Sequence, residues 1–264
     1  MSKKTFELRV EPSRAADYGL ALFRLPARTV KNNEDDAPWQ FVVRVEGVPM
    51  RAVIDQVLAT IKQAGYRPGR DISLSIDPAS SELFHDGRYE FAKSGAPSRS
   101  TSEMIGLFER LVERYPLVFI EDGLSEHDWD GWKTLTERLG ARVLLVGDDI
   151  FVTNPAIIRE AVARRIGNAS LIKLNQIGTV TETLEAIRIS HDGGYRTVIS
   201  HRSGETEDTF IADLAVATQA AYIKTGSMAR SERVAKYNQL VRIETELGSH
   251  AVFGASARAE IAPS

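Results

Sequence analysis

Short apolar runs alternate with amphipathic segments along most of this 264-residue chain. The apolar runs have the length of buried strands, and the segments between them carry apolar residues at helical spacing. We expect strands at 71–77, 117–122, 142–149, 171–176, 195–200 and 221–226, and helices at 54–65, 101–116, 128–140, 154–167, 180–194, 209–220 and 231–248. Such alternation predicts parallel strands covered by helices. The length suits one α/β domain, 1–264, folded as a single TIM-like βα barrel.

The first 50 residues fit this pattern least well. Six βα units follow Asp71, so a closed eight-stranded barrel needs two more strands from residues 1–50. The candidates are FELRV (6–10), GLALFRLP (19–26) and QFVVRV (40–45), and the polar stretch 27–39 between them reads as a loop. We therefore expect an abbreviated, irregular N-terminal part at 1–50, followed by βα units at 51–253 that carry the site.

Composition narrows the classes of function. The chain has no cysteine, which excludes disulfides and thiolate chemistry, and its formal net charge of -3 argues against nucleic acid as a partner. The N-terminal MSKKTFELRVEPSR lacks the apolar run of a signal peptide, and no stretch reaches membrane-spanning length. We expect a cytoplasmic protein that acts on a small molecule and binds neither nucleic acid nor membrane.

Three successive strands end in acids. They are Asp77, Glu121-Asp122 and Asp148-Asp149. In βα barrels the site lies at the carboxyl ends of the strands, and carboxylate oxygens are the ligands that Mg²⁺ prefers. The alternative for each acid is a helix N-cap, where Asp is also favoured. Three consecutive strands with this ending favour a magnesium site.

The next three strands end in cationic or basic residues, namely Lys173, the run His201-Arg202-Ser203, and Lys224. A lysine among other cations can serve as a general base, and the fork of Arg202 matches a phosphate. The alternatives are a Lys173 side chain that reaches outward and a purely structural His201. We expect Glu207, Asp208 and Thr209 to cap the next helix rather than to touch substrate.

From Asp71 to Phe253 the chain resembles the catalytic barrel of the enolase family. The resemblance rests on the motifs SIDPASSELF, YPLVFIEDGLSEHDWDGW, LLVGDDIFVTNP, LIKLNQIGT, SHRSGETEDTFIADL, IKTG and SERVAKYNQLVRIETELG. By motif, it implies that Mg²⁺ is bound by Asp77, Glu121 and Asp148. It also implies that Lys173 is the general base, that Lys224 neutralises the substrate carboxylate, that Arg202 and Ser203 contact phosphate, and that His201 is an active-site histidine.

The chain departs from the enolase pattern in its first 50 residues. Nothing there matches the family's N-terminal capping domain, and Ala21 and Leu22 occupy the place of one expected catalytic glutamate. Glu46, in RVEGVP, is a candidate for the acid that protonates the leaving hydroxyl, with an ordinary turn as the alternative. The half of the site that forms the enolate therefore looks complete, whereas the half that expels hydroxide does not.

The resemblance implies a Mg²⁺-dependent enzyme that passes through an enolate of a 2-phosphoglycerate-like or phosphoenolpyruvate-like acid. An open site suits a second co-substrate, as in a carboxyphosphonoenolpyruvate synthase of a phosphonate natural-product pathway. One alternative is a reduced 2-phosphoglycerate dehydratase that uses Glu46, and another is a non-catalytic binding protein. A homo-oligomer would cover apolar barrel surface that is exposed when the capping domain is absent.

Overall fold

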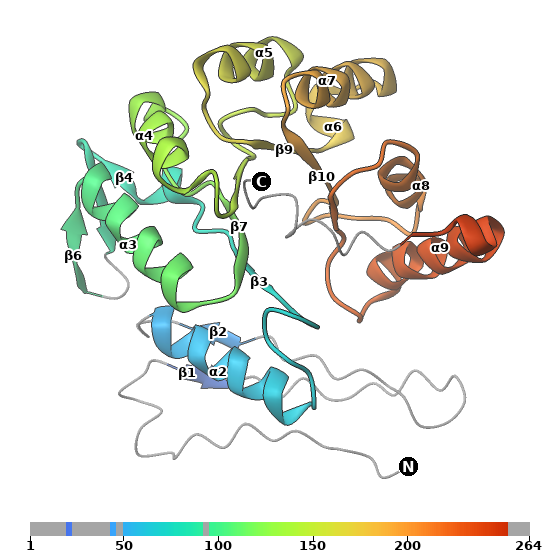
Figure 1. The fold of residues 1–264 in the computed structure, drawn as a ribbon, viewed down its shortest axis with the longest axis horizontal. Helices are drawn as coiled ribbons and strands as arrows, with labels where there is room; N and C mark the ends of the chain where they lie inside the picture. The colour runs from blue at the N-terminus through green and yellow to red at the C-terminus, as the bar shows by residue number, and fades with distance from the viewer. Residues whose placement is uncertain (1–19, 23–42, 46–49, 92–94, 253–264) are drawn as a thin grey trace.

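A curled sheet of six parallel strands forms the centre of the molecule (Figure 1). The computed structural model describes residues 20–22, 43–45, 50–91 and 95–252. The strands lie in the order β11-β10-β9-β8-β7-β3. Their bounds are β3 Leu74–Ile76, β7 Leu117–Glu121, β8 Leu144–Gly147, β9 Ala169–Ile172, β10 Arg196–Ser200 and β11 Tyr222–Lys224. The predicted α/β class with parallel strands is confirmed.

Helices connect successive strands and cover the outer face of the sheet (Figure 1). They are α2 Met50–Gln63, α3 Thr101–Arg114, α4 Trp129–Leu139, α5 Pro155–Arg164, α6 Leu174–Ile177, α7 Val180–Asp192, α8 Phe210–Ala217 and α9 Ser231–Leu247. Asn154 caps α5 and Pro155 occupies its first turn, as its sequence indicates. Among these described helices, none has the length and apolar character that crossing a bilayer requires.

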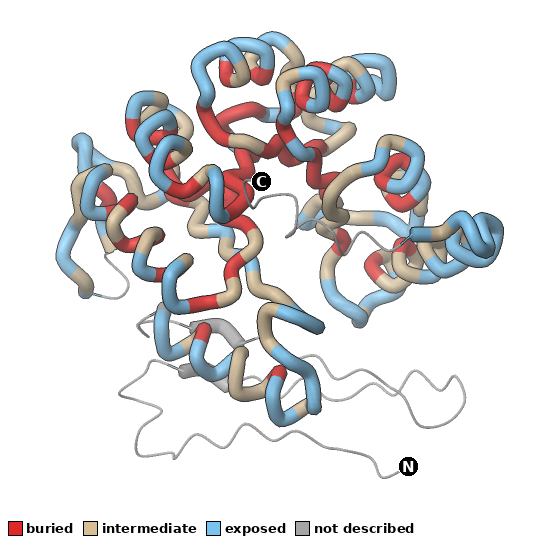
Figure 2. The backbone as a smooth tube through the Cα atoms, in the orientation of Figure 1, coloured by how far each residue is buried: buried red, intermediate tan, exposed pale blue. Residues whose placement is uncertain are grey.

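Alternate residues of the inner strands β7 to β10 face two separate cores. Ile120, Leu145 and Ile199 pack against the surrounding helices. The residues on the opposite, concave face of the sheet form a second buried cluster: Phe119, Leu144, Val146, Ala169, Leu171 and Val198. Figure 2 shows the inner strands β7, β8, β9 and β10 as mostly buried. Burial on both faces explains why these strands are continuously apolar instead of alternating.

The early strands do not extend the six-stranded sheet. GLALFRLP and QFVVRV each supply a three-residue strand, β1 Leu20–Leu22 and β2 Val43–Val45, but these pair antiparallel with each other in a sheet of their own. The expectation that they add two strands to the parallel sheet is therefore wrong for the described residues. FELRV and Glu46 lie outside the described residues.

A small antiparallel sheet interrupts the alternation between β3 and α3. It consists of β4 Phe84–His85, β5 Arg88–Phe91 and β6 Ala96–Arg99, and a 3₁₀ turn, η1 Ser80–Leu83, leads into it. No pattern in the sequence predicted these strands. The buried ring of Tyr89 anchors the sheet, and its hydroxyl donates to Asp128 Oδ2 (3.2 Å) and accepts from the backbone N–H of Ser125 (3.0 Å).

Candidate active site

Parallel pairing gathers the predicted residues at one edge of the central sheet. β8, β7 and β3 are neighbours, so Asp148, Glu121 and Asp77 follow adjacent strands. β9, β10 and β11 come next in the sheet and place Lys173, His201 and Lys224 at the same edge. Because parallel strands all end on one side, residues far apart in the chain converge there.

Lys224 joins the two ends of the sheet. It lies on the edge strand β11, yet its Nζ donates to Asp77 Oδ2 (3.2 Å), which follows the opposite edge strand β3. The same ammonium donates to Glu121 Oε1 (2.7 Å). The sheet is therefore curled enough for one side chain to reach across its concave side. Asp77, Glu121 and Lys224 form one charged group at the strand ends.

Glu121 is the most buried carboxylate of this group, with 1% of the residue exposed. Burial raises its pKa to about 7, Lys224 opposes that rise, and the negative charges of Asp77 and Asp148 add to it. Its Oε1 accepts from Lys224, whereas its buried Oε2 has no hydrogen-bond partner. A buried carboxylate oxygen without a partner is costly unless a cation or a ligand donor reaches it.

Lys173 and Asp148 form the second charged pair. The Lys173 ammonium donates to Asp148 Oδ2, and Gln176 Nε2 lies 3.5 Å from Asp148 Oδ1. The Thr153 hydroxyl accepts from the backbone N–H of Lys173 (2.9 Å) and donates to Gln176 Oε1 (3.0 Å). Strand β9 ends at Ile172 and α6 begins at Leu174, so the predicted strand through residue 176 is too long. Lys173 points inward at this break rather than out to solvent.

Asp122 has a different role from the acids beside it. Its φ of 42° lies in the left-handed region, and its carboxylate accepts from the backbone N–H groups of Asp148 (3.0 Å) and Asp149 (3.0 Å). Burial raises the pKa of Asp122 to about 7, and those two backbone N–H groups counteract the rise. Asp122 thus fixes the backbone that carries Asp148.

The loop after β10 holds His201, Arg202 and Ser203. The backbone N–H of His201 donates to the carbonyl of Lys224 (2.8 Å), which keeps the ends of β10 and β11 together. The guanidinium of Arg202 donates to Asn175 Oδ1 (2.7 Å), and Ser203 is exposed. Arg202 therefore links the loop after β10 to helix α6, with Ser203 at the solvent side.

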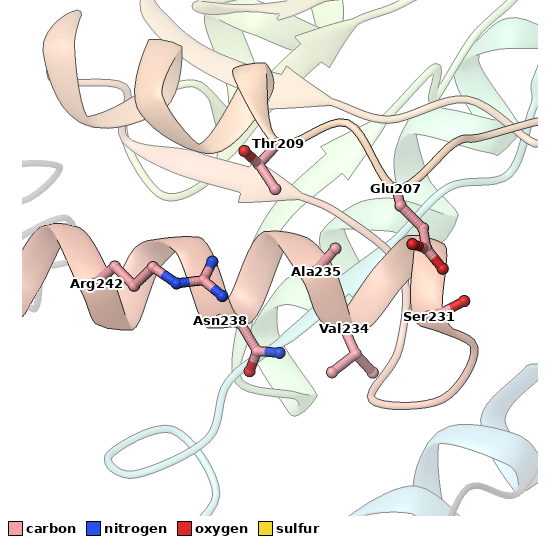
Figure 3. Close-up of a pocket in the computed structure, with 7 residues that line it drawn as sticks. All are labelled: Glu207, Thr209, Ser231, Val234, Ala235, Asn238 and Arg242. Atoms are coloured by element: carbon pink, nitrogen blue, oxygen red, sulfur yellow. The ribbon is translucent and has the colours of Figure 1, made fainter.

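The segment that follows this loop behaves as a helix cap only in part. Asp208 Oδ1 accepts from the backbone N–H of Phe210 (2.9 Å), as predicted. Thr209 occupies the N-cap position of α8 without a side-chain hydrogen bond to the helix, so its predicted capping contact is wrong. Glu207 instead lines a shallow pocket against α9 with Thr209, Ser231, Val234, Ala235, Asn238 and Arg242 (Figure 3). Of the predicted catalytic and metal-binding residues that the structure describes, none lines that pocket.

The carboxylates at the strand ends suit a divalent cation. In the described part of the chain, Asp122, Asp148 and Asp149 bring carboxylate oxygens within 4.8 Å of one another. The predicted set shares Asp148 with this group and adds Asp77 and Glu121. The free Oε2 of Glu121 favours the predicted set, because both oxygens of Asp122 already accept backbone hydrogen bonds. Hard oxygen donors of this kind fit Mg²⁺.

Several residues that shape the site were not singled out from the sequence. Asn175, Gln176 and Thr153 support Arg202, Asp148 and Lys173 respectively. Arg233 and Lys236 lie on α9, where their helical spacing predicted only an ordinary helix. Both are buried, which is unusual for arginine and lysine. This burial marks them as residues that shape the site, and it is visible only in the tertiary structure.

A comparison with known protein families agrees with this geometry. The model of the enolase C-terminal TIM barrel domain matches residues 49–261. The match covers most of the chain and includes every strand of the central sheet. It also includes the acids and lysines gathered at the strand ends. The chain therefore belongs to the enolase family.

Proposed function

We propose that this chain is a Mg²⁺-dependent enzyme that removes the proton α to the carboxylate of a small phosphorylated acid and forms its enolate. The observation that carries the proposal is the pairing of lysines and carboxylates at the strand ends. Lys173 contacts Asp148, and Lys224 contacts Asp77 and Glu121. Members of the enolase family are typically enzymes. Removal of a proton next to a carboxylate on a bound metal requires lysines and carboxylates of this kind.

Each residue has a task that follows from its chemistry. As a neutral amine, Lys173 takes the α-proton, and the Lys224 ammonium holds the substrate carboxylate. Arg202, already oriented by Asn175, and Ser203 hold the phosphate. Asp77, Glu121 and Asp148 would hold Mg²⁺, which stabilises negative charge on the enolate when bound. Asp148 contacts Lys173 and is also a predicted metal ligand, so the base and the metal share one carboxylate.

The fate of the enolate defines the finer proposal. We favour transfer to a second co-substrate, as in an enolase-like carboxyphosphonoenolpyruvate synthase of a phosphonate pathway. This choice is supported by the sequence, which keeps the enolate-forming residues and lacks an acid at Ala21 and Leu22. Expulsion of hydroxide would need an acid, for which Glu46 is the candidate. The two alternatives that the experiment must exclude are a dehydratase and a non-catalytic binding protein.

The test is exchange of the C2 hydrogen of 2-phosphoglycerate with deuterated solvent, followed by NMR in the presence of Mg²⁺. Wild-type protein should catalyse exchange without accumulating phosphoenolpyruvate. Lys173→Ala should lower the exchange rate by roughly 10²–10⁴-fold because the base is lost. Lys133→Ala changes an exposed lysine on α4 and serves as the control.

Each other result excludes part of the proposal. Accumulation of phosphoenolpyruvate that Glu46→Gln abolishes would show a dehydratase. Exchange that survives in Lys173→Ala would remove this lysine from the mechanism. The complete absence of exchange, with candidate phosphonate co-substrates also present, would leave the binding-protein alternative.

A further inference from the structure

Arg233 reaches from α9 to the loop that carries His201. Only 8% of the residue is exposed, and its guanidinium donates to His201 Nδ1. It also donates to the carbonyls of Arg202 (2.8 Å) and Ser203 (2.9 Å). The three acceptors belong to consecutive residues of the loop after β10, where the predicted substrate contacts lie. One buried side chain therefore holds three consecutive residues of this loop.

The contact between Arg233 and His201 determines where the imidazole carries its proton. A guanidinium has five N–H donors and no acceptor, so it can contact a ring nitrogen only as a donor. His201 Nδ1 must then present its lone pair. A ring whose Nδ1 accepts is neutral and carries its proton on Nε2.

The surroundings of His201 also oppose its protonation. Burial lowers its pKa to about 4, and the positive charges of Arg233, Lys224 and Lys236 add to this effect. Glu205 is the negative charge that acts in the opposite direction. An unfolded histidine has a pKa of about 6.5, so the unfolded chain binds more protons between about pH 4 and 6.5. The stabilising contribution of neutral His201 is therefore present above this window and is lost as the pH falls through it.

Gly226 provides the space for this contact. It follows β11 with φ +84°, and a Cβ built there would lie 2.7 Å from Arg233 Cδ and 3.1 Å from His201 Cε1. A side chain at this position would separate arginine from histidine. Gly226 of the IKTG motif therefore has two roles. It adopts the positive φ of the turn, and it leaves room for Arg233 to contact His201.

We propose that Arg233 is a positioning residue that keeps His201 neutral with its proton on Nε2. His201 then offers the substrate a hydrogen-bond donor that does not change with pH in the neutral range, and it does not act as a cationic acid. The role of the donor rests on the function proposed above. The tautomer itself does not, because it follows from contacts within the chain.

The first experiment observes the tautomer directly in wild-type protein. Long-range ¹H–¹⁵N NMR distinguishes a protonated ring nitrogen from one with a lone pair, and His201→Gln assigns the signal among the five histidines. We expect an unprotonated Nδ1 and a protonated Nε2 that persist well below pH 6, the region where an ordinary histidine becomes charged. A His201 that titrates near its ordinary value of 6.5, or that carries its proton on Nδ1, would overturn the proposal.

Variants then test whether Arg233 is the cause. Arg233→Met should return the His201 titration towards about 6.5 and give the exchange rate of 2-phosphoglycerate a new acidic limb. Arg233→Lys should restore part of the effect, and Gly226→Ala should mimic Arg233→Met while keeping the arginine. Arg242→Met, at an exposed position on the same helix, is the control.

The readouts separate this proposal from the proposed function. If Arg233→Met leaves the tautomer and titration of His201 unchanged, the proposal is wrong even when activity falls. If wild-type protein shows no exchange at any pH, the proposed function fails while the NMR titration still decides the role of Arg233. Should Arg233→Met fail to fold, the wild-type spectrum and Gly226→Ala remain as tests.

Discussion

Carboxylates at the strand ends have different roles because their partners differ. Glu121 directs one oxygen to Lys224 and leaves the other without a partner, whereas Asp122 uses both oxygens on backbone N–H groups. Asp149 is exposed, although partial burial and the charge of Asp148 raise its pKa. Residue type alone therefore identifies a region of carboxylates but not which of them remains available to a ligand.

Replacing Asp122 should test its structural role. In Asp122→Ala, two backbone N–H groups lose their acceptor, and we expect the free energy of unfolding to fall by roughly 1–3 kcal/mol in urea titrations. Asp149→Ala removes an exposed carboxylate and should change the free energy of unfolding by less than about 0.5 kcal/mol. Equal losses in the two variants would contradict this assignment.

At the scale of elements, a helix or strand can be predicted from the sequence when its own residues bury an apolar face. It cannot be predicted when it depends on a contact with a distant residue. The helices α3, α4, α5 and α7 bury an apolar stripe against the sheet, so their spacing in the sequence indicates them. The strands β4, β5 and β6 are two to four residues long. They depend on Tyr89, which packs beside Phe84 and bonds to Asp128 at the start of α4. Asp128 also accepts from the Thr101 hydroxyl (2.5 Å), so the small sheet, α3 and α4 share one anchor.

The Tyr89 hydroxyl should contribute measurably to this anchor. Burial raises the pKa of Tyr89, so it stays a donor, and Tyr89→Phe leaves the backbone N–H of Ser125 without an acceptor. We expect a loss of about 1–3 kcal/mol in the free energy of unfolding. Tyr66→Phe, at a residue that is 53% exposed, is the matched control and should be close to neutral. A negligible effect at both positions would mean that packing of the Tyr89 ring alone holds the sheet.

At the scale of the whole molecule, curvature of the sheet assembles the site. Asp77 and Lys224 follow its two edge strands and are separated by 147 residues, yet they form an ion pair. Three metal-binding candidates come from three strands, so an unfolded chain does not hold them together. Metal binding should therefore favour the folded state specifically.

Added Mg²⁺ should raise the thermal and urea stability of the protein. A ligand at about 100 times its dissociation constant adds roughly 2.7 kcal/mol when it binds only the folded state. The gain should disappear on addition of EDTA and should be lost in Glu121→Gln, which weakens a predicted ligand. Glu113→Gln changes an exposed acid on α3 and should keep the full gain. A gain that persists in Glu121→Gln would place the ion elsewhere.

The sequence by itself determined the six parallel strands, most helix positions, and the set of acids and lysines at the strand ends. These features depend on local patterns: apolar runs, helical spacing and the residue that follows each strand. The tertiary structure alone decided that β1 and β2 pair apart from the central sheet. It also decided that Asp122 accepts hydrogen bonds from the backbone of Asp148 and Asp149, and that Arg233 donates to His201. Hydrogen bonds and burial between residues far apart in the chain set these roles, and no local pattern encodes such contacts.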